Sequence, residues 1–279
     1  MLKNKKAEQI KLGKQLLPIG KRTLVMGILN VTPDSFSDGG QFSAIDEAIK
    51  QAYKMALEGA DLIDIGGEST RPGSEQVSAE EELRRIMPVI IALKRDKDFI
   101  LPISVDTYKA AVAEKALSAG VDMINDVWGL KADSELGKVT AHYDVPICLM
   151  HNRNDTNYND LIFDILTELT DSIEIALEAG VRDENIIIDP GIGFGKDLQQ
   201  NLEVMHNLGD FCKLGYPLLL GTSRKSMIGK TLNLPVDDRL EGTAATVALG
   251  ISAGADIVRV HDVKQMRRVA VMADAIIRR

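Results

Sequence analysis

Residues 59–64 read GADLID, and near-copies of this stretch stand at 120–125 (GVDMIN) and 254–259 (GADIVR). Each copy follows a stretch with helical periodicity, opens on a glycine suited to end a helix, and runs through apolar residues to a polar side chain. The apolar run is too short for a helix, so we predict a buried strand at each copy. This order of helix, glycine, strand and polar tip predicts a repeated β/α unit.

Five further apolar runs fit the same strand role: TLVMGILNV (23–31), PISVDT (102–107), PICLMH (146–151), NIIIDPG (185–191) and PLLLGTS (217–223). Helical periodicity fills intervening stretches such as 43–60, 78–95 and 160–180. Eight strands alternating with helices over roughly 250 residues predict an α/β fold, a single-domain (β/α)8 TIM barrel. An open doubly wound sheet is the alternative. It is disfavoured because no Pro- or Ser-rich linker divides the chain and polar residues close nearly every strand.

Bulk composition limits the class of protein. The 279 residues are 45% hydrophobic, enough for one large core, and we treat 1–279 as one domain with residues 1–22 as an N-terminal extension. No run approaches the roughly 18 apolar residues of a membrane span, and the lysine-rich start lacks a signal-peptide block. We therefore expect a soluble, cytoplasmic protein with no membrane partner. A net charge of −8 argues against broad nucleic-acid binding. Cys148 and Cys212 lie in unrelated apolar contexts and are expected to be free thiols.

Polar residues close the expected strands: Asn30, Asp64, Asp106, Asn125, His151, Asp189, Ser223 to Ser226, Arg259 and His261. Because the C-terminal ends of barrel strands meet at one mouth, these groups are expected to share a pocket. Asp106, Asn125 and Asp189 follow apolar residues and should recognise a flat heterocycle that presents several N–H groups. A protein-dominated metal site is the competing interpretation, disfavoured because no His/Asp/Glu cluster has ligand spacing. Mg²⁺ carried by a phosphorylated substrate fits better.

Arg259 and His261 lie two apart in VRVH, so both side chains face the same side of their strand. An arginine that faces into a barrel needs an anion or a carboxylate partner. Phosphate sites in such barrels are often built after strands seven and eight. GTSRKS (221–226) occupies the first of these places and offers hydroxyls and charge on Ser223, Arg224, Lys225 and Ser226. A helix cap with solvated basic residues would explain SRKS alone, but together with Arg259 and His261 we favour an anion site.

The stretch DPGIGFGKD (189–197) looks like a nucleotide loop but fails both common patterns. Pro190 and Asp197 stand where a phosphate-binding P-loop needs Gly and Ser or Thr, and Lys196 replaces the third glycine of a dinucleotide motif. A glycine-rich turn remains, which would let the backbone approach a flat ligand with Phe194 packed on it. The stretch after the fifth strand, Asn152 to Tyr158, has no predicted role.

Eight segments in this order resemble dihydropteroate synthases: MGILNVTPDSFSDGG (26–40), GGESTRPGS (66–74), SVDT (104–107), IND (124–126), LMH (149–151), DPGIGFGK (189–196), GTSRKS (221–226) and VRVHD (258–262). The resemblance covers roughly residues 23 to 265. It implies an enzyme that condenses 6-hydroxymethyl-7,8-dihydropterin diphosphate with p-aminobenzoate and releases diphosphate with the help of Mg²⁺. It also implies a homodimer.

The resemblance further implies roles for individual residues. Pterin would be bound by Asp106, Asn125, Asp189 and Lys225, in a pocket lined by Met150, Phe194 and Gly221. Asn30 would hold Mg²⁺, and Arg259 and His261 the diphosphate. The p-aminobenzoate would be framed by Thr70, Arg71, Pro72, Phe36 and Ser226. Since an aryl amine is a weak nucleophile, we expect diphosphate to depart before attack, with Asp106, Asp189 and Asp38 favouring the transient cation.

Two other functions stay open at this point. The methyltetrahydrofolate corrinoid methyltransferases are related pterin-binding barrels that would share the Asp and Asn pocket but not STRPG together with SRKS. A catalytically silent relative would bind pterin without turnover, since a fold and a site can outlast a function.

Overall fold

The computed structural model describes residues 8–32, 40–68 and 76–278, with no side-chain description for 40–43. Eight parallel strands form one sheet in the order β8-β7-β6-β5-β4-β3-β10-β9. Their bounds are Leu24–Asn30 (β3), Leu62–Gly66 (β4), Ile103–Asp106 (β5), Met123–Asp126 (β6), Ile147–Met150 (β7), Ile186–Asp189 (β8), Leu219–Leu220 (β9) and Ile257–Val260 (β10). An isolated bridge between Ile188 and Leu218 joins the two edges. The predicted (β/α)8 barrel is confirmed, and each predicted strand is present.

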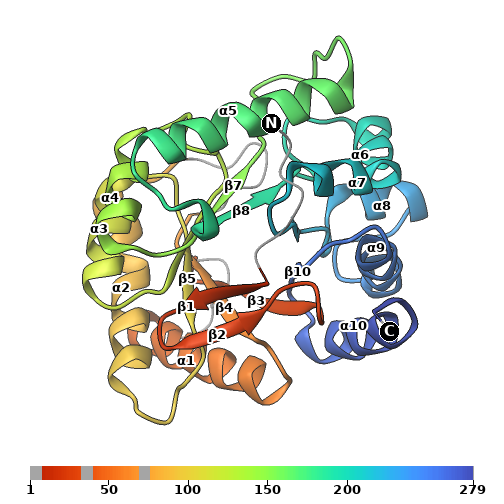
Figure 1. The fold of residues 1–279 in the computed structure, drawn as a ribbon. Helices are drawn as coiled ribbons and strands as arrows, with labels where there is room; N and C mark the ends of the chain where they lie inside the picture. Colours follow the sequence, from red (N-terminus) through yellow and green to blue (C-terminus); the bar gives the residue numbers. More distant parts are fainter. Residues whose placement is uncertain (1–7, 33–39, 69–75, 279) are drawn as a thin grey trace.

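Helices surround this sheet in chain order (Figure 1). They span Gly40–Leu57 (α1), Ala79–Arg95 (α2), Ala110–Ser118 (α3), Glu135–Tyr143 (α4), Leu161–Glu178 (α5), Leu198–His206 (α6), Leu208–Phe211 (α7), Ser226–Leu232 (α8), Leu240–Ser252 (α9) and Val263–Ile277 (α10). Two short 3₁₀ turns cover Asp183–Asn185 and Cys212–Leu214. The glycines that open the three sequence copies, Gly59, Gly120 and Gly254, have φ of 97°, 96° and 108°. This left-handed conformation ends each helix and favours glycine.

Alternation along the strands divides the core into two parts. Outward residues such as Ile63, Ile65 and Val105 pack against the surrounding helices in one large cluster. The inward residues nearest the N-terminal ends of the strands form a separate apolar cluster: Leu24, Met26, Leu62, Met123, Cys148, Ile187, Leu219 and Ile257. Because the pleat has a period of two, the next inward positions are the strand-end residues. The barrel is therefore apolar at one end and polar at the other.

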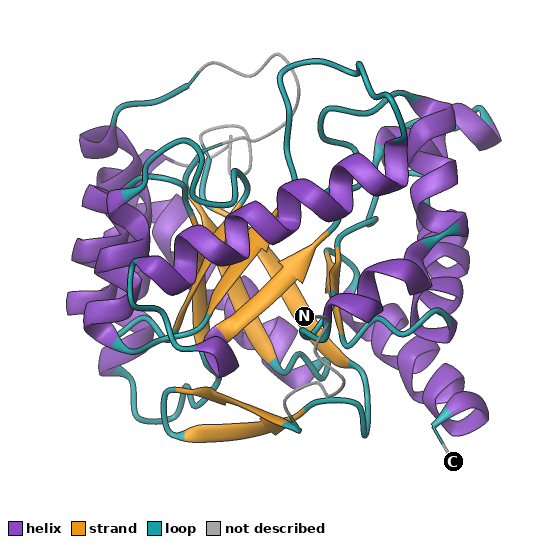
Figure 2. Cartoon of the chain, turned by 45° about the horizontal axis from the view of Figure 1, so that its top comes forward, coloured by secondary structure: helices purple, strands orange, loops and turns teal. Residues whose placement is uncertain are grey.

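The N-terminal extension contains a hairpin that the sequence did not predict. Strands Gln9–Leu12 (β1) and Gln15–Pro18 (β2) pair in antiparallel register. Ile10, Leu12, Leu17 and Ile19 join the inner apolar cluster. Figure 2 shows the hairpin crossing the end of the barrel opposite the long strand-to-helix loops. The strands are too short for periodicity to reveal them, and the hairpin closes the apolar end of the barrel.

The expectations from composition concerned the cysteines and membrane-spanning segments. Cys148 is buried and Cys212 half-buried, and neither forms a disulfide. Over residues 8–32, 40–68 and 76–278, no helix has both the length and the apolar character needed to cross a bilayer.

Candidate active site

The inward strand-end residues gather at the polar end of the barrel, whereas His151, also expected in the shared pocket, instead contacts Lys196 and lies 3.5 Å from Glu168 of α5. The gathered residues are Asn30, Gly66, Asp106, Asn125, Met150, Asp189, Gly221 and Arg259, one from each strand or from the residue that follows it. Asp106, Asn125, Met150 and Asp189 are almost completely buried. Parallel pairing aligns Asp106 with Asn125 and Met150 with Asp189. The barrel mouth therefore carries a ring in which Asn30, Asp106, Asn125, Asp189 and Arg259 supply polar side chains above an apolar floor.

Arg259 lies at the centre of this ring. Its Nε donates to Asp64 Oδ2 at 2.6 Å, and its Nη2 donates to Asp106 Oδ2 at 2.8 Å. Asn125 Nδ2 donates to the same Asp64 oxygen at 3.0 Å. The expectation that an inward arginine has an anionic partner is met here by two carboxylates of the chain itself. The burial of Arg259 therefore does not by itself require an external anion.

Asp64 is a site residue to which the sequence assigned no role. It lies two residues after Leu62 on β4, so its side chain also faces the barrel interior, and it is fully buried. Asp64 Oδ1 and Asp106 Oδ1 are buried without a hydrogen-bond partner among the described residues. An unpaired buried acceptor costs free energy, so both oxygens favour a ligand that presents N–H donors. The sequence marks Asp64 as a strand end, and its contacts with Arg259 and Asn125 assign its role.

A second wall is built from β8, β9 and the glycine-rich loop. Asp189 Oδ1 accepts from the Gly191 amide at 2.7 Å. A Cβ placed on Gly221 would lie 3.9 Å from both Asp189 Oδ2 and Arg259 Cβ, which puts Gly221 between the two charged residues. Lys225 donates to the Ile192 carbonyl, and its Nζ lies 4.3 Å from the centre of the Phe194 ring. The charged side chains of Asp189 and Lys225 thus lie beside the aromatic ring of Phe194 at the mouth.

Burial shifts the protonation of these groups toward neutrality. Desolvation raises the pKa of Asp106 to about 7, although the nearby Arg259 charge acts in the opposite direction. It also raises the pKa of Asp189, against the effect of Lys225. Desolvation lowers the pKa of Lys225 to about 8, and Asp189 opposes this shift. Polar ligand groups that bond these side chains would favour their charged forms.

The predicted anion segment is only partly as expected. Ser223 Oγ lies 3.0 Å from His261 Nδ1 and accepts from the His261 amide at 3.2 Å. Arg224, with a left-handed φ of 57°, instead directs its guanidinium to Asp262, with contacts of 2.6 and 3.0 Å. The guanidinium of Arg224 is therefore paired with a carboxylate, and the structure leaves its expected contribution to the anion site untested. Ser226 is exposed at the first position of α8.

Asn30 closes β3 beside Gly66 and Asp106. A Cβ on Gly66 would lie 3.7 Å from Asn30 Oδ1 and 3.9 Å from Asp106 Oδ2, so the two oxygens flank one small gap. Among the described residues, no three His, Cys, Asp or Glu side chains gather as a metal cluster. One amide oxygen and one carboxylate suit Mg²⁺, which takes few protein ligands and completes its shell with water and phosphate. The residues present therefore fit this ion.

A cleft of about 680 Å³ opens outside this ring. Its lining comes from strand-to-helix loops and from α5, and includes Tyr108, Trp128, Lys131, Arg153 and Asp155. None of the inward strand-end residues lines it, so we place the candidate chemistry at the barrel mouth. The five candidate residues Phe36, Asp38, Thr70, Arg71 and Pro72 lie outside the described residues.

Comparisons with known proteins agree with this geometry. The profile of the family described as "Pterin binding enzyme" matches residues 26–261. A dihydropteroate synthase from Clostridium beijerinckii is 59% identical over 97% of this chain and 100% of that protein. A crystal structure of the Clostridium difficile dihydropteroate synthase with pteroic acid is 56% identical, with a TM-score of 0.91, over 94% of this chain and 99% of that one. The Xanthomonas albilineans dihydropteroate synthase with 4-aminobenzoic acid is 40% identical, also with a TM-score of 0.91, over 97% and 98%.

Fold and mouth together define a barrel enzyme with its polar site at the C-terminal ends of the strands. The family match covers most of the chain, and the relatives are similar over nearly their whole lengths. The chain belongs to the pterin-binding enzymes and, within them, to the dihydropteroate synthases, which are transferases.

Proposed function

We propose that this chain condenses 6-hydroxymethyl-7,8-dihydropterin diphosphate with p-aminobenzoate to give 7,8-dihydropteroate and diphosphate. The observation that carries the proposal is the pair of buried, unpartnered acceptors, Asp64 Oδ1 and Asp106 Oδ1. A pterin presents ring and exocyclic N–H groups in one plane, which match carboxylate acceptors at the mouth of a barrel. The related structures described in the presence of pteroic acid and with 4-aminobenzoic acid support the same pair of substrates.

The heterocycle is assigned to the ring of inward residues. Asp106, Asn125 and Asp189 read its edge by hydrogen bonds, and Lys225 donates to an acceptor of the ring. Met150, Phe194 and Gly221 are proposed to line the faces of the ring. Asp64 orients Asn125 and Arg259 through Oδ2, which leaves Oδ1 to accept from the ring.

The diphosphate is assigned to the rim above Arg259. Arg259 uses two donors on carboxylates and keeps others for an anion, since a guanidinium has five N–H groups. His261, next to Ser223, lies two residues along the same strand. When bound at Asn30, Mg²⁺ would supply Lewis-acid stabilisation of the leaving diphosphate.

The reaction is proposed to be dissociative. The carbon–oxygen bond to diphosphate breaks first, Arg259 and His261 hold the departing anion, and Asp106 and Asp189 lie close to the positive charge left on the pterin methylene. The aryl amine then forms the new carbon–nitrogen bond and loses one proton. Asp38 is proposed to favour the cation as well. Thr70, Arg71, Pro72, Phe36 and Ser226 are proposed to frame the aryl amine.

The test is a coupled assay of diphosphate release with both substrates and Mg²⁺. Release that requires p-aminobenzoate, with dihydropteroate as the product, supports the proposal. Pterin binding without release of diphosphate would identify a silent relative instead. We also propose a homodimer in the cytoplasm, and light scattering of the purified protein tests the dimer.

A further inference from the structure

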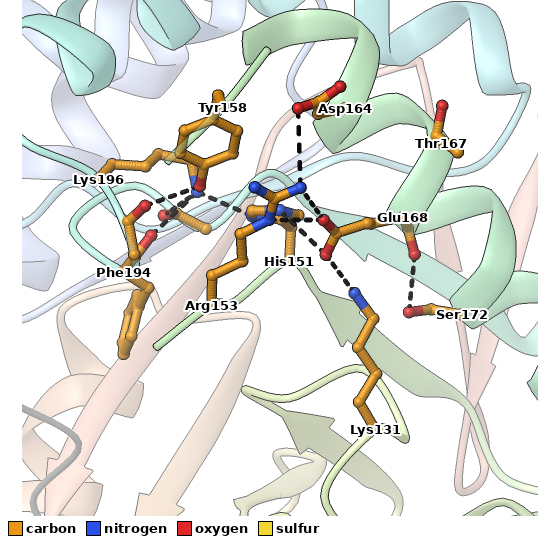
Figure 3. Close-up of polar contacts among 12 residues, drawn as sticks. Lys131, His151, Arg153, Tyr158, Asp164, Thr167, Glu168, Ser172, Phe194 and Lys196 are labelled. Atoms are coloured by element: carbon orange, nitrogen blue, oxygen red, sulfur yellow. Dashed lines mark hydrogen bonds and ion pairs between the residues drawn. The ribbon is translucent and has the colours of Figure 1, made fainter. Parts of the chain in front are cut away.

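The loops after β7 and β8 are bonded to each other through buried side chains (Figure 3). At the centre is Lys196, which belongs to the glycine-rich loop. Its Nζ lies 2.9 Å from His151 Nδ1 and donates to the carbonyls of Gly191 and Phe194, each at 3.0 Å. One ammonium group therefore connects the end of β7 with two points of the following loop.

The surroundings of His151 favour its bond with Lys196. Its side chain is fully buried, and its backbone amide donates to the Asp189 carbonyl at 2.9 Å. Burial lowers the pKa of Lys196 to about 7, and in its ammonium form Lys196 has no acceptor, so that His151 Nδ1 then accepts and Nε2 carries the proton. That Nε2 lies 3.5 Å from Glu168 Oε2 on α5. Burial and the Lys196 charge lower the pKa of His151 to about 2, so the ring stays neutral.

Residues of the loop 152–158 also contact Glu168 and the glycine-rich loop. Arg153 Nε donates to Glu168 Oε1 at 2.6 Å, and its guanidinium carbon lies 4.3 Å from the centre of the Tyr158 ring. Tyr158 in turn donates its hydroxyl to the Gly195 carbonyl at 2.7 Å. A Cβ on Gly195 would come within 2.8–2.9 Å of the Arg153 backbone. The segment 152–158 therefore lies directly against the glycine-rich loop.

The glycine-rich loop supplies three parts of the candidate heterocycle wall. The Gly191 amide bonds Asp189, the Ile192 carbonyl accepts from Lys225, and the Phe194 ring lies beside Lys225. Glycine-rich backbone has little conformational preference of its own, so external bonds must fix its position. Lys196 bonds the two carbonyls that flank this stretch, at Gly191 and Phe194.

We propose that Lys196 and His151 are positioning residues for the heterocycle. The Lys196–His151 bond holds residues 191–194 in the conformation that places Phe194 and Lys225 against the ring, and the 152–158 segment supports it from outside. Neither residue needs to touch the reacting atoms. This inference rests on the proposed pterin substrate, and it gives a role to two segments for which sequence patterns offered none.

The first experiment compares Lys196→Met with Lys131→Met. Lys131 Nζ donates to Glu168 Oε2 at 2.5 Å, the oxygen that also lies near His151 Nε2. Lys131 makes no bond to the glycine-rich loop, so it serves as the control. Calorimetry with 6-hydroxymethyl-7,8-dihydropterin, which lacks the diphosphate, measures the heterocycle subsite alone. We expect at least a tenfold loss of affinity for Lys196→Met, with Lys131→Met within twofold of the parent. In steady-state assays the KM for the pterin substrate should rise more than kcat falls.

A second pair of variants separates positioning from folding. In His151→Asn the amide oxygen can accept from Lys196 near the position of Nδ1, whereas His151→Leu has no acceptor. We expect His151→Asn to keep pterin affinity within threefold and His151→Leu to lose tenfold or more, at matched urea midpoints. If Lys196→Met does not fold, this pair still decides the question.

Three outcomes would overturn the inference: parent-like affinity in Lys196→Met, equal affinities in the two His151 variants, or a parent protein that does not bind the pterin. The last would also remove the proposed function. The first two leave that function intact, so the two failures are distinguishable.

Discussion

Arg259 Nη2 donates to Asp106 Oδ2 at 2.8 Å, joining residues 153 positions apart across the barrel mouth. Asp106 belongs to the proposed heterocycle subsite and Arg259 to the proposed anion subsite. The contact therefore couples the two subsites, because a change in either charge alters the other. It also means that Arg259 remains neutralised when no anion is bound.

Arg259→Met tests this coupling. The substitution leaves Asp64 and Asp106 as buried carboxylates without their cation, which costs about 3–5 kcal/mol of unfolding free energy. It should raise the pKa of Asp106 further, so affinity falls for pterins with and without diphosphate. Arg259→Lys keeps the charge but not the forked contact to two carboxylates, and we expect it to fold well and lose mainly turnover. Urea unfolding and calorimetry measure both effects. A Met variant with normal stability would show that the carboxylates do not depend on Arg259.

Asp189→Asn tests the opposite wall. An asparagine oxygen can still accept from the Gly191 amide, so the fold and the loop should be kept. The lost charge weakens a charge-assisted bond to the pterin by about 1.5–3 kcal/mol, roughly a tenfold or greater loss of affinity. Calorimetry with the pterin ligand measures it. Unchanged affinity would remove Asp189 from the heterocycle subsite.

Gly221→Ala tests whether the space between Asp189 and Arg259 is occupied by ligand. The added Cβ would make ordinary contacts at 3.9 Å, so the melting temperature should stay close to that of the parent. If the ring lies there, pterin affinity should fall by at least tenfold. Gly191→Ala is the contrasting variant, because its Cβ would come within 1.9 Å of the His151 carbonyl and destabilise the protein itself. Full affinity in Gly221→Ala would place the ring elsewhere.

His151 predicts a pH dependence of stability. Its pKa of about 2 lies below the ordinary value of 6.5, chiefly because of burial. Below pH 6.5 the unfolded chain therefore binds a proton that the folded chain does not, and stability falls as the pH falls. The slope is about 1.4 kcal/mol per pH unit, or about 2 kcal/mol between pH 6.5 and 5.

Urea unfolding at pH 7.5 and pH 5 measures this difference. His151→Asn should lose about 2 kcal/mol less than the parent over this range. Identical slopes for parent and His151→Asn would mean that His151 is protonated in the folded state.

The barrel and its polar ring were predictable because each depends on local patterns. Glycine-ended helices and short apolar runs indicate the eight strands, and the convergence of the C-terminal ends of barrel strands predicts that Asp106, Asn125, Asp189 and Arg259 share one mouth. Arg224 shows the limit of such reasoning. Its neighbours in SRKS suggested an anion site, but its partner, Asp262, is 38 residues away in the sequence.

The glycine-rich loop shows a second limit. In the sequence, Lys196 lies in a stretch that resembles a nucleotide loop, and because that motif fails, the pattern predicts no role for it. Its bond to His151 joins residues 45 positions apart, and no spacing rule links a histidine at one strand end to a lysine in the next loop. Asp64 was recognisable as a strand end, but its carboxylate could be assigned only once Arg259 and Asn125 were seen to share it.

The N-terminal hairpin provides a stability test that is independent of the active site. Leu12 is almost completely buried against the apolar floor of the barrel, whereas Leu16 in the same hairpin is 64% exposed. Leu12→Ala should therefore cost about 2–5 kcal/mol of unfolding free energy, through lost burial and the cavity left behind. Leu16→Ala should change it by less than about 0.5 kcal/mol. Because the hairpin covers the end of the barrel opposite the mouth, folded Leu12→Ala should keep the parent's KM values. Equal unfolding midpoints for the two variants would show that the hairpin is not part of the cooperative core.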